Sequence, residues 1–382
     1  MTLPGPDAGK AAQAVAPAAV PAAKPGVAPA EPTWPDLLHA LLSGADLAAE
    51  QTGWAMNQIM SGAASHARVA AFVVALRAKG ETAAEISGMV ASMLDFALPV
   101  HADAALLAAA VDTCGTGGDR SHTVNLSTMA AIVVAAAGIP VVKHGNRASS
   151  SSCGSADLLE ELGVAIELSP TGVASTLADA GIAFCFARAF HPAMRHVGPV
   201  RAELGVPTAF NILGPLTNPA RPGAQSLGVA DARLAPVMAR VLADRGTRAL
   251  VFRGDDGLDE LSPSAPSTIW VTGGDGELRT ERFDPRDVGI DVPDREALRG
   301  ADAPFNAGVT RALLAGKPGP VRDAVLLAAA AAIVAAEGPT DQPVTEQIRS
   351  QLDRAAAAVD SGRAAALLER WAAASQTAAV PA

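Results

Sequence analysis

The 382-residue chain has few aromatic residues and no tyrosine. Aromatic residues make up 3% of the sequence and hydrophobic residues 49%, so most of the core must consist of alanine, valine and leucine. A chain of this length can bury a large core and form two domains. The composition therefore indicates a large globular protein with small core side chains.

Cysteine and positive charge are also scarce. Cys114, Cys153 and Cys185 are odd in number and lack metal-ligand spacing, which argues against a disulfide framework or a zinc site and favours a reducing cytoplasm. We expect Cys114 and Cys185 to be small buried hydrophobes. The formal net charge of −10 argues against general nucleic-acid binding, which needs a basic face, but is compatible with a local basic pocket.

Long apolar runs are absent from the sequence. The longest, Ala324 to Ala336, falls short of the roughly eighteen residues of a membrane span and predicts a buried helix instead. Residues 1–32 are dominated by alanine, proline and glycine, and we expect them to form a disordered extension because they cannot bury enough surface. Met1 to Ala8 contains no basic residue, which does not fit a signal peptide. We therefore expect no association with a membrane.

Residues 33–104 show helical periodicity. Leu37, Leu38, Leu41 and Leu42 fall on one face, and glycines separate successive segments. Thr82 and Glu85 have the spacing of a capping box. The pattern predicts four short helices that form a small helical domain.

Beyond this region, short strands alternate with helices. We expect strands at residues 108–111, 139–142, 164–168, 182–187, near 227 and at 249–253. Helices are expected at 156–162, from 170 onward and at 324–337. Residues 267–272 and 277–283 should form a hairpin. Such alternation predicts an α/β fold with a mostly parallel central sheet covered by helices. Residues 191–222 interrupt the alternation. We therefore assign 105–190 and 223–378 to this larger domain.

Three polar motifs follow the first two predicted strands. Their sequences are Asp112-Thr-Cys-Gly-Thr-Gly-Gly-Asp119, Asn125-Leu-Ser-Thr128 and Lys143-His-Gly-Asn-Arg147. Glycines let backbone N–H groups converge on an anion, and the start of a helix offers further unpaired N–H groups. Singly, a glycine cluster is often a tight turn and the Lys143 motif could be a solvated loop. Together they indicate a nucleotide or sugar-phosphate site at one edge of the sheet.

An acidic segment, Gly254-Asp-Asp-Gly-Leu-Asp-Glu260, follows the strand at 249–253. It is either a solvated acidic turn or a metal site, since adjacent carboxylates at a strand end suit Mg²⁺. A neighbouring phosphate site favours the second reading, because Mg²⁺ shares carboxylate and phosphate oxygens. Asp259 and Glu260 are thus candidate magnesium ligands.

The three motifs in this order resemble the signature of the anthranilate phosphoribosyltransferase family, and the resemblance runs from about Trp34 to the C-terminal region. It implies that phosphoribosyl pyrophosphate and anthranilate are the substrates, Mg²⁺ the cofactor and tryptophan biosynthesis the pathway. It also implies a homodimer formed through the helical domain, which residues 191–222 complete, and a cleft between the domains. The nucleophile is an aniline nitrogen that is already neutral at pH 7, so no catalytic nucleophile or base is expected. Catalysis should come from positioning and from stabilising the leaving pyrophosphate.

The resemblance also assigns residues. Arg201 corresponds to the arginine that binds the anthranilate carboxylate, while His144 and Asn146 line the same site. Lys143 contacts the phosphoribosyl group, and Ser127, Asp259 and Glu260 are the implied metal-binding residues. The implied substrate-binding residues are Gly115, Thr116, Gly117, Gly118, Asp119, Thr123, Asn125, Ser127, Thr128, Lys143, His144, Gly145, Asn146 and Arg201.

One segment departs from the family pattern. The family usually has Ser-Ser-Lys-Ser-Gly after the Lys143 motif, whereas this chain has Ser152 in place of the lysine and Cys153 in place of the last serine. A thiol is a weaker hydrogen-bond donor than a hydroxyl, so we expect reduced affinity for the sugar phosphate if that serine holds it.

Two alternatives stay open at this point. A pyrimidine nucleoside phosphorylase shares the helical and α/β architecture and a glycine-rich phosphate loop, but lacks the Lys143 motif and the acidic pair. A non-catalytic paralogue that binds nucleic acid would need a basic track on its surface. Cleavage of thymidine by phosphate would identify the first, and filter binding at low salt the second.

Overall fold

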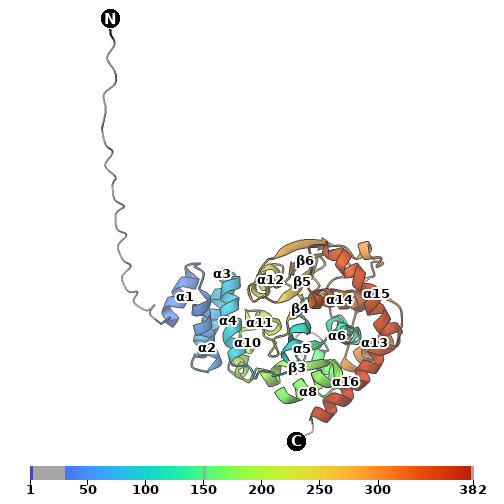
Figure 1. Cartoon of the computed structure of the whole chain (residues 1–382). Helices are drawn as coiled ribbons and strands as arrows, with labels where there is room; N and C mark the ends of the chain where they lie inside the picture. The colour runs from blue at the N-terminus through green and yellow to red at the C-terminus, as the bar shows by residue number, and fades with distance from the viewer. Residues whose placement is uncertain (3–30, 149–151, 380–382) are drawn as a thin grey trace.

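The computed structural model describes residues 1–2, 31–148 and 152–379. A small helical unit lies beside a larger unit built around a sheet (Figure 1). Nearly all of the predicted extension, residues 1–32, lies outside the described residues.

Four helices begin the helical unit, as predicted: α1 (Trp34–Leu42), α2 (Ala49–Met60), α3 (His66–Lys79) and α4 (Ala83–Asp95). The predicted capping box forms, because Thr82 Oγ1 accepts the Glu85 N–H and Glu85 Oε2 accepts the Thr82 N–H. Helices α2 and α4 approach closely at Gly88, where a Cβ would lie 2.0 Å from the Ala49 carbonyl oxygen. The absence of a side chain there allows the contact.

A later part of the chain returns to this unit. It contains the 3₁₀ helix η1 (Pro192–His196), α10 (Gly198–Leu204) and α11 (Phe210–Leu216), and the short helix α9 (Ala187–Phe190) precedes it. Val200 and Leu213 share a hydrophobic core with Phe72 of α3. Helices α10 and α11 therefore pack in the same core as α3.

The larger unit contains a seven-stranded sheet in the order β3-β2-β1-β4-β5-β6-β7. Its strands are β1 (Val111–Gly115), β2 (Val141–Gly145), β3 (Ile182–Phe186), β4 (Ala224–Gly228), β5 (Arg248–Gly254), β6 (Ser267–Thr272) and β7 (Arg279–Phe283). The first five strands in sequence are parallel, and β6 and β7 form the antiparallel hairpin that was predicted. The mostly parallel sheet is confirmed.

Helices cover both faces of this sheet. They are α5 (Ala104–Ala109), α6 (Leu126–Ala136), α7 (Ser155–Glu161), α8 (Pro170–Ala180), α12 (Ala235–Asp244), α13 (Ala303–Leu314), α14 (Pro320–Glu337), α15 (Val344–Asp360) and α16 (Arg363–Ala379), with the 3₁₀ helices η2 (Pro285–Val288) and η3 (Arg295–Leu298). Helices α6 and α14 share a core with Val111 and Ala224 on one face. On the other face, Cys114 and Leu227 share a core with α12 and the helical unit. The sheet is therefore buried between two layers, and the second layer includes the helical unit.

The apolar run at 324–336 lies in α14 and is buried, as predicted. None of the helices in the described ranges is both long and apolar enough to cross a bilayer. Cys114 and Cys185 are buried and form no disulfide, as predicted, and Cys153 is also buried.

Some predicted strand limits were wrong. Residues 108–109 are the last residues of helix α5 and not part of a strand. Asp103 caps the start of this helix by accepting the Leu106 N–H, and β1 begins only at Val111. The strand predicted at 139–142 occupies 141–145, so Lys143 and His144 lie within it.

Residues 164–168 form no strand. The Val164 N–H bonds to the Leu159 carbonyl and the Ala165 N–H bonds to Ser375 Oγ of α16. Bonds to the end of α7 and to α16 thus replace the expected sheet neighbour.

Candidate functional site

The glycine loop leaves the sheet at the carboxyl end of β1. Gly117 and Gly118 have φ values of 68° and 84°, a left-handed conformation that strongly favours glycine. No atom lies within 4 Å of a Cβ built on either residue, so the loop presents open backbone. Thr116 holds its base, because its N–H donates to the Gly228 carbonyl (3.0 Å) and its Oγ1 accepts the Ala230 N–H (3.1 Å).

The acidic segment after β5 meets this loop. Asp259 Oδ2 accepts the Gly117 N–H at 2.6 Å. Two glycines make room for the contact: a Cβ at Gly115 would lie 2.4 Å from Asp259 Oδ2, and one at Gly228 would lie 1.6 Å from the Asp259 carbonyl oxygen. The structure therefore brings together two motifs that were predicted separately and lie 142 residues apart.

Lys143 connects β2 to the start of α6. Its side chain is 2% exposed, and Nζ donates to the Thr113 carbonyl and to Ser127 Oγ. Burial lowers the pKa of Lys143, whereas the negative charges of Asp112 and Glu260 raise it. The Lys143 motif and the Ser127 motif thus form one cluster.

Lys143 is a positive charge that acts on the acidic pair, since it lowers the pKa of Glu260. Burial raises the pKa of Asp259 to about 7, with a further contribution from the charge of Asp119. Burial, and then the charge of Asp259, raises the pKa of Glu260 to about 8. Asp119 Oδ2 is buried without a hydrogen-bond partner in the described structure. Repulsion between these acidic groups thus helps to raise the pKa values of Asp259 and Glu260, and a divalent cation would relieve that repulsion.

The acidic residues at this site suit Mg²⁺ better than a metal ion whose ligands all come from the protein. The described residues contain no group of three or more histidine, cysteine or acidic side chains arranged to hold an ion. Mg²⁺ usually binds through one or two carboxylates and keeps its other positions for water or substrate phosphate. Asp259 and Glu260 match that pattern, and the open backbone of Gly117 and Gly118 lies beside them.

Asn125 has a different local role from the one expected at a helix start. It occupies the N-cap position of α6, but its side chain makes no capping bond. Its Oδ1 accepts Asn306 Nδ2 (2.9 Å) and its Nδ2 donates to the Cys153 carbonyl (3.0 Å). Asn125 thus ties α6 to α13 and to the loop after β2, and Asn306 has no local sequence signal that predicts the contact.

His144 faces a second histidine that was not predicted as a site residue. The rings of His144 and His191 are 5.1 Å apart, and the Nε2 atoms of both are buried without a hydrogen-bond partner among the described residues. Burial lowers the pKa of His144 to about 3 and that of His191 to about 4. His144 Nδ1 pairs with the Gly214 carbonyl at 2.9 Å, so its neutral ring has a fixed orientation.

Asp112 and Asn218 fix the backbone at this point. Asp112 Oδ1 accepts the His144 N–H (3.1 Å), and Asp112 Oδ2 accepts Asn218 Nδ2 (3.0 Å). Asn218 Nδ2 also donates to the Val142 carbonyl (2.8 Å). The position of His144 therefore depends on residues from β1 and from the segment after α11.

The remaining predicted residues are less directly connected. Asn146 Oδ1 accepts the Arg147 N–H, and Gly145 lies where a Cβ would be 2.2 Å from Ser155 Oγ. Thr123 pairs with Arg299 in an isolated bridge.

Arg201 lies on α10, where burial lowers its pKa, and no bond in the described structure joins its side chain to the loops. Ser152 and Cys153 flank residues outside the described ranges; the Cys153 thiol is buried, which raises its pKa to about 11.

Comparisons with known proteins agree with this geometry. Residues 35–97 match the "Glycosyl transferase family, helical bundle domain" and residues 107–365 match the "Glycosyl transferase family, a/b domain". An anthranilate phosphoribosyltransferase from Frankia alni is 68% identical over 92% of this chain and 98% of its own length. One from Salinispora arenicola is 57% identical over 89% of this chain and 96% of its own length.

Solved structures give the same result. The anthranilate phosphoribosyltransferase of Thermus thermophilus superposes with a TM-score of 0.82 and 41% identity, over 89% of this chain and 99% of that one. The Saccharomyces cerevisiae enzyme, solved in complex with PRPP and Mg, superposes with a TM-score of 0.81 and 28% identity, over 91% and 99% of the two chains.

Proposed function

The chain belongs to the anthranilate phosphoribosyltransferase family, and from this we propose that it transfers the phosphoribosyl group of phosphoribosyl pyrophosphate to the amine of anthranilate. The products are N-(5-phosphoribosyl)anthranilate and pyrophosphate, within tryptophan biosynthesis. The observation that carries the proposal is the bond from the Gly117 N–H to Asp259, which joins the phosphate loop to the acidic pair. A pyrimidine nucleoside phosphorylase or a nucleic-acid-binding paralogue lacks support from the relatives.

Mg²⁺ is the cofactor in this proposal. Ser127, Asp259 and Glu260 would hold it, and it would supply positive charge to offset the negative charge of the pyrophosphate. The backbone N–H of Gly118 donates to the pyrophosphate, whereas the Gly117 N–H is held by Asp259, and Lys143 adds a positive charge near the carboxyl end of β2. Asp119, Thr123, Asn125 and Thr128 complete this half of the site.

The aromatic acid binds across the cleft from the phosphates. Arg201 offers its guanidinium to the carboxylate, because two parallel N–H groups match two carboxylate oxygens. His144 and Asn146 line the same pocket, and the neutral His144 ring adds no charge beside the amine. The amine attacks without a protein base, so the chain acts by holding the two substrates in line and excluding competing water.

We also propose a homodimer in the cytoplasm. Leu42 of α1 and Val74 of α3 are 79% and 42% exposed on the helical unit, which supports an interface there. The domain limits of 33–104 with 191–222, and of 105–190 with 223–378, belong to the same proposal.

The decisive experiment follows the fluorescence of anthranilate. We expect it to fall when the chain, phosphoribosyl pyrophosphate and Mg²⁺ are all present, and to stay constant when either of the last two is omitted. Release of thymine from thymidine and phosphate, without loss of anthranilate fluorescence, would instead identify a nucleoside phosphorylase.

A further inference from the structure

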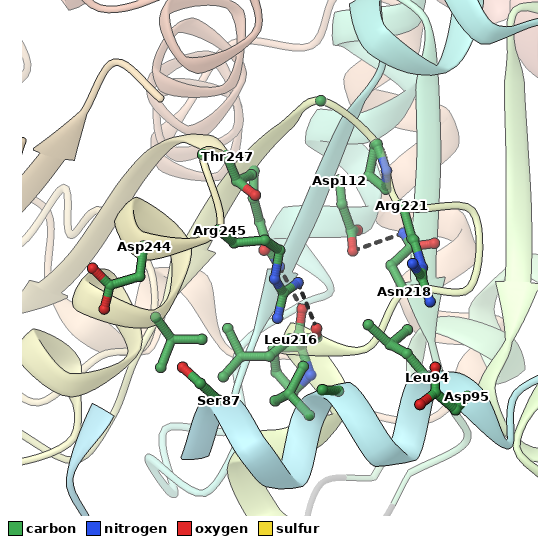
Figure 2. Close-up of a pocket in the computed structure, with 18 residues that line it drawn as sticks. Ser87, Leu94, Asp95, Asp112, Leu216, Asn218, Arg221, Asp244, Arg245 and Thr247 are labelled. Atoms are coloured by element: carbon green, nitrogen blue, oxygen red, sulfur yellow. Dashed lines mark hydrogen bonds between the residues drawn. The ribbon is translucent and has the colours of Figure 1, made fainter. Parts of the chain in front are cut away.

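A cavity of about 610 Å³ lies at the opposite edge of the sheet from the phosphate loops (Figure 2). Gly223 and Thr247, which immediately precede β4 and β5, line it, whereas the candidate active site lies at the carboxyl ends of those strands. No residue assigned above to substrate or metal lines this cavity. It is therefore a separate space, of a size suited to a small organic molecule.

Two arginines line the cavity without an acidic partner. Among the described residues, no carboxylate lies within salt-bridge distance of Arg221 or Arg245. Arg245 Nη1 donates to the Leu216 carbonyl at 2.9 Å, and Figure 2 shows its side chain extending across the space toward Leu216. Desolvation within the cavity lowers the pKa of Arg245 to about 10, with a contribution from the positive charge of Arg221, although both arginines retain solvent-exposed surface. Asp95, Asp112 and Asp244 also line the cavity, but none of their carboxylates forms an ion pair with either guanidinium group in the described structure.

The backbone conformation of Arg221 also indicates a functional role for this residue. Its φ is 50°, in the left-handed region that a side chain such as arginine rarely adopts. No side-chain bond of Arg221 in the described structure compensates for this conformation, which places the side chain beside Asn218 on the cavity wall. Strain of this kind is characteristic of functional positions.

The other walls indicate what the arginines could bind. Val90 and Leu94 of α4, Leu216 of α11 and Val241 of α12 provide apolar surface. Helices α4, α11 and α12 also end at this cavity, and a helix C-terminus carries partial negative charge. This negative potential, together with the lining carboxylates of Asp95, Asp112 and Asp244, disfavours a doubly charged phosphate more than a singly charged carboxylate, which two guanidinium groups can bind.

We propose that this cavity is a binding site for a small organic carboxylate with an apolar body, whose carboxylate contacts Arg221 and Arg245. The site is distinct from the substrate cleft. Because α4 belongs to the helical unit and α12 to the sheet unit, the bound molecule touches both.

The test uses the full chain carrying Arg201→Ala, so that the proposed anthranilate site no longer holds a carboxylate. Binding of 3-phenylpropionate is measured by ligand-observed NMR, with its methyl ester and inorganic phosphate as further probes. We expect binding of the acid, much weaker binding of the ester, and no displacement of the acid by equimolar phosphate.

Three further variants locate the site. Arg221→Gln and Arg245→Gln should each weaken binding by roughly two- to fivefold, the scale of one partly exposed ion pair. Arg221 makes no side-chain bond in the described structure, so its variant should fold even if loss of the Arg245 bond to Leu216 disturbs α11. Arg233→Gln is the control and should bind normally, because Arg233 and its ion-pair partner Asp231 both lie outside the cavity lining. Equal binding of acid and ester, or unchanged binding in Arg221→Gln, would overturn the proposal.

Discussion

Asp259 is the residue on which the candidate active site depends most. Its carboxylate fixes the phosphate loop through Gly117, and the same side chain is a proposed metal ligand. Replacement of Asp259 and Glu260 by alanine should therefore reduce turnover by at least about a hundredfold, the effect of removing an electrostatic stabiliser where charge develops. Added Mg²⁺ should restore only part of the activity. Unchanged turnover with an unchanged Mg²⁺ requirement would contradict the assignment.

The same pair should make stability depend on pH and on Mg²⁺. With pKa values of about 7 and about 8, the metal-free folded chain keeps protons that the unfolded chain releases near pH 4. Raised pKa values in the folded state mean that the pair's contribution to stability is present at low pH and lost as the pH rises through 7 to 8. Mg²⁺ binds the deprotonated pair, so it should raise the melting temperature more at pH 8 than at pH 5.5.

Melting curves at both pH values, with and without Mg²⁺, test this expectation. The matched control replaces Asp259 with asparagine and Glu260 with glutamine, which removes the titrating groups and should abolish the Mg²⁺ effect. His144 and His191 act in the opposite direction below pH 6.5, but their effect cancels when curves with and without Mg²⁺ are compared at one pH. An equal Mg²⁺ effect at both pH values would refute the explanation.

Arg201 separates the two substrates. Arg201→Ala should weaken apparent anthranilate affinity by roughly 1.5–3 kcal/mol, the usual contribution of a hydrogen bond to a charged group, or about ten- to more than a hundredfold. The Michaelis constant for phosphoribosyl pyrophosphate should change far less, because its phosphates contact the sheet unit. Steady-state kinetics measure the Michaelis constants of both substrates, and a normal melting curve shows that the variant is folded. Equal losses for both substrates would mean that Arg201 supports the cleft as a whole.

At the scale of helices and strands, close approach at Gly228 positions the acidic segment against β4. A Cβ there would lie 1.6 Å from the Asp259 carbonyl oxygen, so the backbone of the segment would have to move. Gly228→Ala should destabilise the chain by about 1–3 kcal/mol, the usual effect of overpacking, and lower turnover by roughly tenfold or more.

The matched control is Gly308→Ala in α13, where no atom lies within 4 Å of the added Cβ. This change should stabilise the helix by about 0.5–1 kcal/mol without affecting turnover. Denaturant unfolding and initial rates of both variants distinguish the effects. Normal turnover in Gly228→Ala would show that the segment tolerates displacement.

Local signals explain which elements the sequence could predict. The helices of residues 34–95 follow from apolar periodicity and from the Thr82 cap, both of which act within a few residues. The strand predicted at 164–168 failed because its backbone bonds to Ser375, 210 residues away, which no local pattern encodes. The contact of Gly117 with Asp259 could be anticipated because parallel strands bring their carboxyl ends to one edge.

Contacts made by buried side chains were harder to anticipate. His191 and Asn218 lie in the segment predicted to join the helical domain, yet their partners are on β1 and β2. Asn306 was not anticipated, because it reaches Asn125 across 181 residues. The motifs thus located the site, whereas the residues that orient its side chains became evident only in three dimensions.

At the scale of the whole molecule, Arg77 links the two units. This residue of α3 contacts Asp231, which follows β4, at 2.8 Å. It also lies 3.6 Å from Glu81, whose carboxylate is fully buried and has no hydrogen-bond partner in the described structure. One guanidinium therefore compensates a buried charge in the helical unit and holds that unit against the sheet.

Arg77→Gln should destabilise the chain by roughly 1–3 kcal/mol, less than for a fully buried pair because Arg77 is 28% exposed. Most of the loss should come from leaving Glu81 buried without a countercharge, so the additional change Glu81→Gln should recover part of it. Arg233→Gln is the matched control, because Arg233 also contacts Asp231 but lies in the sheet unit. Denaturant unfolding of the four variants, including Glu81→Gln alone, gives the coupling between Arg77 and Glu81. If Arg77→Gln and Arg233→Gln cost the same, the bond to Asp231 would be a surface ion pair with no special role in joining the units.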